Sequence, residues 1–109
     1  MLHICGNTLP VIDDMADTGV DVLEIDHKVN LMQAKEITRD RVCLMGNLDP
    51  VAILMQSSPE VVAEKSLQAI NDAGLGGGFI LGSGCEVAVQ TAKENLIALR
   101  DVAHMHCYK

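Results

Sequence analysis

Residues 21–45 read DVLEIDHKVNLMQAKEITRDRVCLM, and this stretch decides the fold that we predict. It opens on a short apolar run that ends in an acidic residue, residues 21–26, as buried strands often do. Asn30 then stands three residues before Gln33, which is typical of the start of a helix. A second strand, residues 41–45, follows that helix. A strand, a helix and another strand in this order indicate a parallel βαβ unit.

The same alternation continues on both sides of this unit. Residues 2–5 form a short strand followed by a helix, and residues 46–50 (GNLDP) break the chain after the third strand. A long helix then begins with Ser58 as its cap, and residues 79–83 form the fourth strand. Residues 91–94 (TAKE) match a capping box and predict the start of the last helix. The chain therefore contains four strand–helix units.

Four such units in 109 residues are about half of the roughly 250 residues of a typical eight-unit barrel. We therefore predict an α/β fold, half of a (β/α)₈ TIM-type barrel, with residues 1–109 as a single domain. An open four-stranded sheet exposes two edges, which natural proteins avoid. We expect these edges to pair with another copy of the chain or with a missing N-terminal half.

Composition excludes several classes of partner. The net charge is −7 and no basic stripe is present, which argues against binding to nucleic acid. No apolar run reaches the about eighteen residues of a membrane span, and no charged and apolar leader is present. Four cysteines without such a leader favour free thiols or metal ligands and a cytoplasmic location.

Strand alternation predicts which side chains meet at the carboxyl ends of the strands, where barrels place their chemistry. The parity that turns apolar residues such as Ile4, Leu23, Ile25 and Leu44 toward the helices turns another set toward the barrel mouth: His3, Cys5, Asp26, Asn47 and Cys85. On the fourth strand it turns Phe79, Leu81 and Ser83 inward as well. Imidazole and thiolate are ligands that Zn²⁺ prefers. His3, Cys5 and Cys85 supply three such ligands and leave one of the four positions around the metal open, as in a catalytic site. The sequence therefore predicts a zinc site.

Several of these segments also resemble a known family. They are His3-Ile4-Cys5-Gly6, residues 19–26, the GNLDP turn at 46–50, residues 77–81 and Gly84-Cys85 with Glu94-Asn95. Together they are similar to the C-terminal half of the uroporphyrinogen decarboxylase superfamily and, more narrowly, to its methylcobamide:coenzyme M methyltransferases. The resemblance covers nearly the whole chain. The H-x-C motif with a later cysteine distinguishes the zinc methyltransferases from the decarboxylases.

The resemblance implies a set of roles for residues of this chain. His3, Cys5 and Cys85 are the implied zinc ligands, Asp26 is the candidate fourth ligand, and Glu24 is the second choice for that place. The implied reaction moves a methyl group from a methylated corrinoid protein, or methylcobalamin, to a thiol such as coenzyme M, with no protein side chain as nucleophile. We expect Asn47 and Ser83 to lie in the substrate pocket.

Two other interpretations stay open. One is a uroporphyrinogen decarboxylase-like enzyme, although that family makes no use of the cysteine pair. The other is a truncated fragment without activity that only self-associates. If Met1 is the natural start, the strand that carries His3 and Cys5 lacks its usual neighbours, and we expect weaker zinc binding than in a full barrel.

Overall fold

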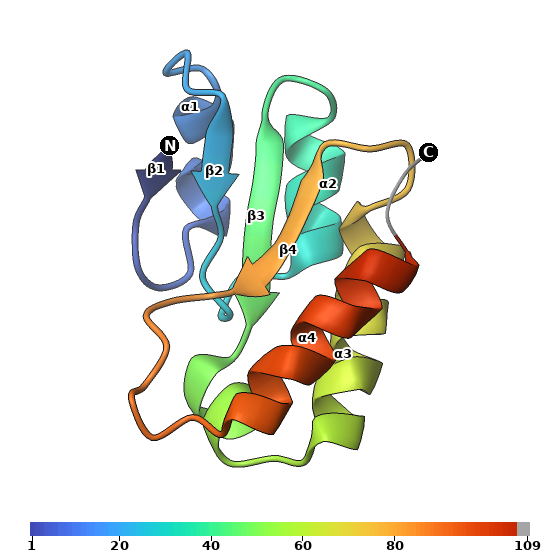
Figure 1. The fold of residues 1–109 in the computed structure, drawn as a ribbon. Coiled ribbons are helices and arrows are strands. Elements are labelled where there is room, and N and C mark those ends of the chain that lie inside the picture. Colours follow the sequence, from blue (N-terminus) through green and yellow to red (C-terminus); the bar gives the residue numbers. More distant parts are fainter. Residues whose placement is uncertain (107–109) are drawn as a thin grey trace.

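Four parallel strands form one sheet, in the order β1-β2-β3-β4 (Figure 1). The structure is a computed structural model, and it describes residues 1–106 of the chain. The strands are β1 (Leu2–His3), β2 (Val22–Glu24), β3 (Cys43–Leu48) and β4 (Phe79–Ser83). Each strand pairs in parallel with the next strand of the chain. The predicted succession of parallel βα units is confirmed.

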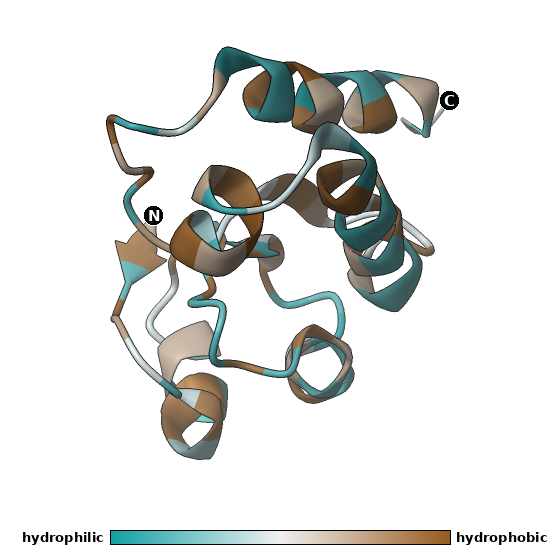
Figure 2. Cartoon of the chain, turned by 90° about the horizontal axis from the view of Figure 1, so that it is seen from below, coloured by the Kyte–Doolittle hydropathy of each residue, from teal (hydrophilic) through white to brown (hydrophobic). Residues whose placement is uncertain are grey.

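Helices connect the strands and lie outside the sheet. They are α1 (Ile12–Ala16), α2 (Leu31–Thr38), α3 (Pro59–Ala73) and α4 (Lys93–Met105), with a 3₁₀ turn, η1 (Leu9–Val11), before α1 and a π-helix, η2 (Pro50–Met55), after β3. Consecutive helices pack against one another, and Figure 2 shows them as an arc around the strands. This arrangement is half of a (β/α)₈ barrel. Among the described residues, none of the helices is long and apolar enough to cross a membrane.

The hydrophobic core lies between the sheet and this arc of helices. Leu23, Ile25 and Leu44 point into it and are fully buried, together with Ile12 from α1 and Val62 from α3. The residues between them on the strands point to the opposite face, where burial is incomplete. The predicted parity of β2 and β3 is therefore confirmed.

The helix caps predicted at Asn30 and Ser58 form, whereas Thr8, whose hydroxyl can also cap a helix, makes no side-chain cap bond. The side chain of Asn30 accepts a hydrogen bond from the Gln33 N–H, and Ser58 accepts one from Val61 N–H. The capping box predicted at residues 91–94 is wrong, because α4 begins after Ala92 without a side-chain cap. The hydroxyl of Thr91 is buried there and makes no hydrogen bond.

Strand β3 is longer than predicted. Residues 46–48, expected as part of a turn, continue the strand because they pair with residues 81–83 of β4. Glycine is required at position 46, since a Cβ there would lie 2.7 Å from the carbonyl oxygen of Ile25 on the neighbouring strand. The turn begins only at Asp49, whose carboxylate accepts hydrogen bonds from the backbone of Val51 and Ala52 and so caps η2.

The predicted parity of β4 is wrong. Phe79 and Leu81 pack against the core, while Ile80 faces the opposite side and is 45% exposed. The prediction assumed regular alternation up to Cys85, but β4 ends at Ser83, which pairs with the core residue Leu48. Ile4, expected to face the helices, is 46% exposed for a similar reason, since β1 ends at His3. Cys5 and Cys85 therefore both follow their strands as parts of loops.

Candidate metal centre

His3 lies at the carboxyl end of the edge strand β1, next to Glu24 of β2. Its ring Nδ1 is 3.1 Å from the carbonyl oxygen of Glu24. A carbonyl oxygen only accepts, so Nδ1 carries the proton and donates it. The other nitrogen, Nε2, keeps its lone pair and lies 3.3 Å from the sulfur of Cys5. This is the tautomer in which a histidine binds a metal through Nε2 with an oriented second nitrogen.

Cys85 reaches the same place from the loop after β4. Its sulfur lies 3.8 Å from that of Cys5, although 80 positions separate the two in the sequence. The hydroxyl of Ser83 donates a hydrogen bond of 2.7 Å to the Cys85 carbonyl. Gly84 touches the backbone of His27 so closely that any side chain would overlap it. The first contact lies within the loop, and the close approach at Gly84 lets the loop lie against His27, just after β2.

Asp26 follows β2 and is buried, with 3% of its surface exposed. Its Oδ2 accepts a hydrogen bond of 3.0 Å from the N–H of Gly6, and its Oδ1 accepts one of 2.9 Å from Lys28. Burial of the carboxylate raises its pKa, but the hydrogen bonds from Gly6 and Lys28 outweigh that effect, so the pKa of Asp26 lies below its usual value. Asp26 is therefore ionised at neutral pH.

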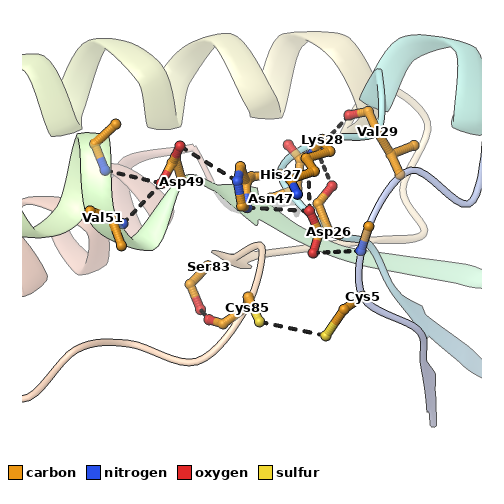
Figure 3. A network of polar contacts seen from close by, with 12 residues as sticks. Cys5, Asp26, His27, Lys28, Val29, Asn47, Asp49, Val51, Ser83 and Cys85 are labelled. Atoms are coloured by element: carbon orange, nitrogen blue, oxygen red, sulfur yellow. Dashed lines mark hydrogen bonds and ion pairs between the residues drawn. The ribbon is translucent and has the colours of Figure 1, made fainter.

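These side chains form a cluster of four donor atoms, one each from His3, Cys5, Asp26 and Cys85, all within 4.8 Å of one another. Figure 3 shows three of them, Cys5, Asp26 and Cys85. Two thiolates that share a zinc ion in tetrahedral geometry are about 3.8 Å apart, given Zn–S distances of about 2.3 Å. The sulfur separation of 3.8 Å matches that value. The donor set and its spacing thus fit Zn²⁺.

The electrostatics of the cluster also favour a cation. The pKa of the Cys5 thiol is raised, first by its hydrogen bond with Cys85 and by the charge on that residue, and further by Asp26 and Glu24. Negative charge on Cys5 is therefore disfavoured while no cation lies among these groups. A divalent cation reverses this effect, because it stabilises thiolates directly.

The other predicted site residues lie around this cluster. Glu24 contributes its backbone carbonyl to His3, and its carboxylate is not among the four donors. Asn47 donates its side-chain amide to the carbonyls of Asp26 and Val29, at 3.2 and 2.9 Å. The side-chain nitrogen of Asn47 and the hydroxyl of Ser83 thus contact the main chain, and contact of these residues with substrate stays a prediction.

Two contributors to the site were not predicted from the sequence. The N–H of Gly6 orients Asp26, and Gly84 allows the loop that carries Cys85 to approach His27. Each glycine immediately follows or precedes a predicted cysteine ligand in the sequence, which was the available signal. The contacts themselves join segments far apart in the chain, so local patterns do not reveal them.

The lowered pKa of Asp26 predicts a dependence of stability on pH. A carboxylate whose pKa is lower in the folded than in the unfolded state stabilises the fold above about pH 4 and ceases to do so as the pH falls through the folded-state value. We expect Asp26→Asn to lower the free energy of unfolding by about 1–3 kcal/mol at pH 7, because a hydrogen-bonded buried charge is lost. The difference should shrink as the pH falls below the unfolded-state pKa and through the lower folded-state pKa of Asp26. Urea denaturation of the metal-free proteins between pH 7 and 2.5 measures it, and a constant difference would contradict the assignment.

Comparison with known proteins places this geometry in a family. The family model described as uroporphyrinogen decarboxylase (URO-D) matches residues 1–106. The chain belongs to the uroporphyrinogen decarboxylase family. Within this family it is 37% identical over 108 residues to the methylcobamide:CoM methyltransferase MtbA of Methanosarcina acetivorans, and 31% identical over 93 residues to the uroporphyrinogen decarboxylase of Nitrosomonas europaea.

A solved structure has the same fold. A methyltransferase from Methanosarcina mazei superposes with a TM-score of 0.86 at 30% identity, over 95% of this chain. The match spans 30% of that protein, and the chain likewise spans 30% of the length of the M. acetivorans MtbA. The half-barrel described above is thus shared with a longer methyltransferase.

Proposed function

We propose that this chain carries the zinc centre of an enzyme that transfers a methyl group from a methylated corrinoid protein to a thiol such as coenzyme M. The observation that supports it most is the cluster of His3, Cys5, Asp26 and Cys85, whose donor atoms lie within 4.8 Å of one another at the strand ends. The similarity to MtbA over 99% of the chain points the same way.

In this proposal the residues of the chain bind the metal and orient its ligands. His3, Cys5 and Cys85 hold the metal, and Asp26 is the fourth ligand. Asp26 would be the exchangeable ligand of the four, because the N–H groups of Gly6 and Lys28 stabilise its charge independently of a metal. A bound zinc ion supplies Lewis acidity that keeps the substrate thiol as a thiolate at neutral pH.

The transfer itself needs no nucleophile from the protein. The sulfur of the acceptor thiol forms a bond to the methyl carbon, and the electron pair of the broken cobalt–carbon bond stays with the corrinoid. The thiol proton leaves to solvent. The chemistry is that of the corrinoid, while the protein contributes position and charge.

The other family activity, decarboxylation of a porphyrinogen, is the alternative. The relatives include uroporphyrinogen decarboxylases at 31% identity. Two thiols 3.8 Å apart beside an oriented imidazole favour the methyltransferase, because they have a role in metal binding, whereas the decarboxylases make no use of a cysteine pair.

We further propose that the open sheet pairs with a complementary half-barrel, either from a second copy or from another part of a longer chain. Strands β1 and β4 are edges of the sheet, and each presents unpaired backbone groups. Ile80 adds an apolar side chain to the uncovered face. A barrel completed in this way also covers the mouth where the four donors lie.

The test begins with metal content. The chain is purified without a metal-binding tag, and zinc per chain is measured after dialysis; we expect a value near one. Thiol methylation by methylcobalamin is then followed optically through the release of cob(I)alamin. A folded, metal-free protein would refute the zinc proposal. Zinc binding without thiol methylation would instead support the alternative of a chain that is inactive by itself.

A further inference from the structure

Strand β3 contributes no donor atom to the metal cluster, yet one of its side chains contacts the loop that carries a proposed ligand. The amide nitrogen of Asn47, near the end of β3, donates to the carbonyl oxygens of Asp26 and Val29. Both hydrogens of the amide are therefore used within one loop (Figure 3).

The loop in question is a tight turn. The N–H of Val29 donates to the Asp26 carbonyl at 3.0 Å, which closes the turn, and the N–H of Lys28 donates to the Asp26 carboxylate inside it. Asn47 bonds to the first and the last residue of this turn, so it bridges the two ends. Val29 is 3% exposed, and an unpaired carbonyl at this depth would be costly.

We infer that Asn47 is a positioning residue for the metal centre: it holds the 26–29 turn so that the Asp26 carboxylate faces His3, Cys5 and Cys85. This inference rests on the proposed zinc function, and it gives Asn47 a role other than contact with substrate. A weakened turn leaves Asp26 free to rotate away from the other donors. Partners behind a metal ligand typically contribute about 10–100-fold to metal affinity.

The fold offers a matched control for this role. The amide of Asn95, on α4, likewise donates to two main-chain carbonyls, those of Leu54 and Ser57, at 2.8 and 2.9 Å. It is 2% exposed and links α4 to the end of η2, and none of its partners carries a donor of the cluster. Asn47→Leu and Asn95→Leu therefore remove equivalent hydrogen bonds, but only Asn47→Leu removes support from the turn that carries the proposed ligand Asp26.

The experiment is a double-mutant cycle read by metal affinity. Cobalt(II) serves as the probe, and its binding is followed through the thiolate-to-metal absorption band and by chelator competition. We expect Asn47→Leu to weaken binding about 10-fold in the wild-type background and by less than about 2-fold when Asp26 is already alanine. Asn95→Leu should lower the unfolding temperature and leave the affinity within about 2-fold.

The outcomes separate this inference from the proposed function. An equal loss in both Asp26 backgrounds, no loss, or an equal loss in Asn95→Leu would overturn it. If Asn47→Leu does not fold, Asn47→Ser, which keeps one donor, replaces it in the same cycle. A wild-type chain that binds no cobalt or zinc would refute the metal proposal instead, and amide hydrogen exchange then tests the turn alone: the Lys28 and Val29 amides should exchange faster in the Asn47 variant, and unchanged exchange overturns the inference.

Discussion

Replacing Cys5 or Cys85 with serine should abolish stoichiometric zinc binding, the largest effect that we predict. Structural zinc sites gain about 10–16 kcal/mol from four ligands, so the loss of one thiolate corresponds to about 3 kcal/mol, or at least about 100-fold in affinity. Serine keeps the size of the side chain but offers a hydroxyl that does not ionise near neutral pH. Zinc per chain, measured after dialysis against a chelator, should fall from near one to near zero.

Cys43 provides the control for this experiment. It is a half-buried free thiol on β3, and it lies outside the four-donor cluster. Cys43→Ser should keep zinc at one per chain with an affinity within about 2-fold of the wild type, since distant sites act independently. If Cys43→Ser loses as much zinc as Cys5→Ser, or if Cys5→Ser keeps it, the assigned ligand set is wrong.

Gly84→Ala should destabilise the fold and separate Cys85 from the other ligands. A Cβ at position 84 would overlap the backbone of His27, which, unlike a side-chain tip, has no rotamer by which to move aside. Overpacking of this kind costs about 1–3 kcal/mol, and we expect the upper end. The loop can avoid this overlap only by moving away from His27, and that movement takes Cys85 away from Cys5. Urea denaturation and zinc affinity measure the two consequences.

Gly82→Ala is the matched substitution within β4. A Cβ there meets only the flexible side chain of Met45, at 3.4 Å, which is an ordinary contact. Gly82→Ala should change the free energy of unfolding by less than about 1 kcal/mol and leave zinc affinity unchanged. Equal destabilisation by the two substitutions would mean that contact with His27 is not what requires glycine at position 84.

The repeated strand and helix patterns were sufficient to predict the order of elements, because each depends on the spacing of apolar residues within a few turns of chain. They were not sufficient where pairing between strands determines how far a strand extends. Residues 46–48 have the composition of a turn, but they extend β3 because residues 81–83 lie beside them. The parity of β4 was wrong because regular alternation was assumed beyond the point where the strand ends at Ser83.

The site shows the same division. The sequence predicted that imidazole, thiol and carboxylate groups after β1, β2 and β4 lie together, because parallel strands bring their carboxyl ends to one edge, and the four-donor cluster matches this. That these groups bind a metal stays a prediction. The choice between Asp26 and Glu24 as the fourth donor could not be predicted from the sequence. The two residues are two positions apart, so strand alternation points both carboxylates to the same face of the sheet. The backbone of Gly6, 20 positions away, donates to Asp26, and Glu24 instead binds His3 through its carbonyl.

The sequence by itself thus determined which chemical groups are available and which strand end each one follows, because residue type and local periodicity are properties of the chain alone. Only the tertiary structure decided that Cys5 and Cys85, 80 positions apart, lie 3.8 Å from each other. Only the tertiary structure decided, too, that Asn47 supports the turn behind Asp26. Both depend on the course of the loops after the strands end, and contacts between distant segments set that course. Gly84 lies against the backbone of His27, and the N–H of Gly6 donates to the Asp26 carboxylate.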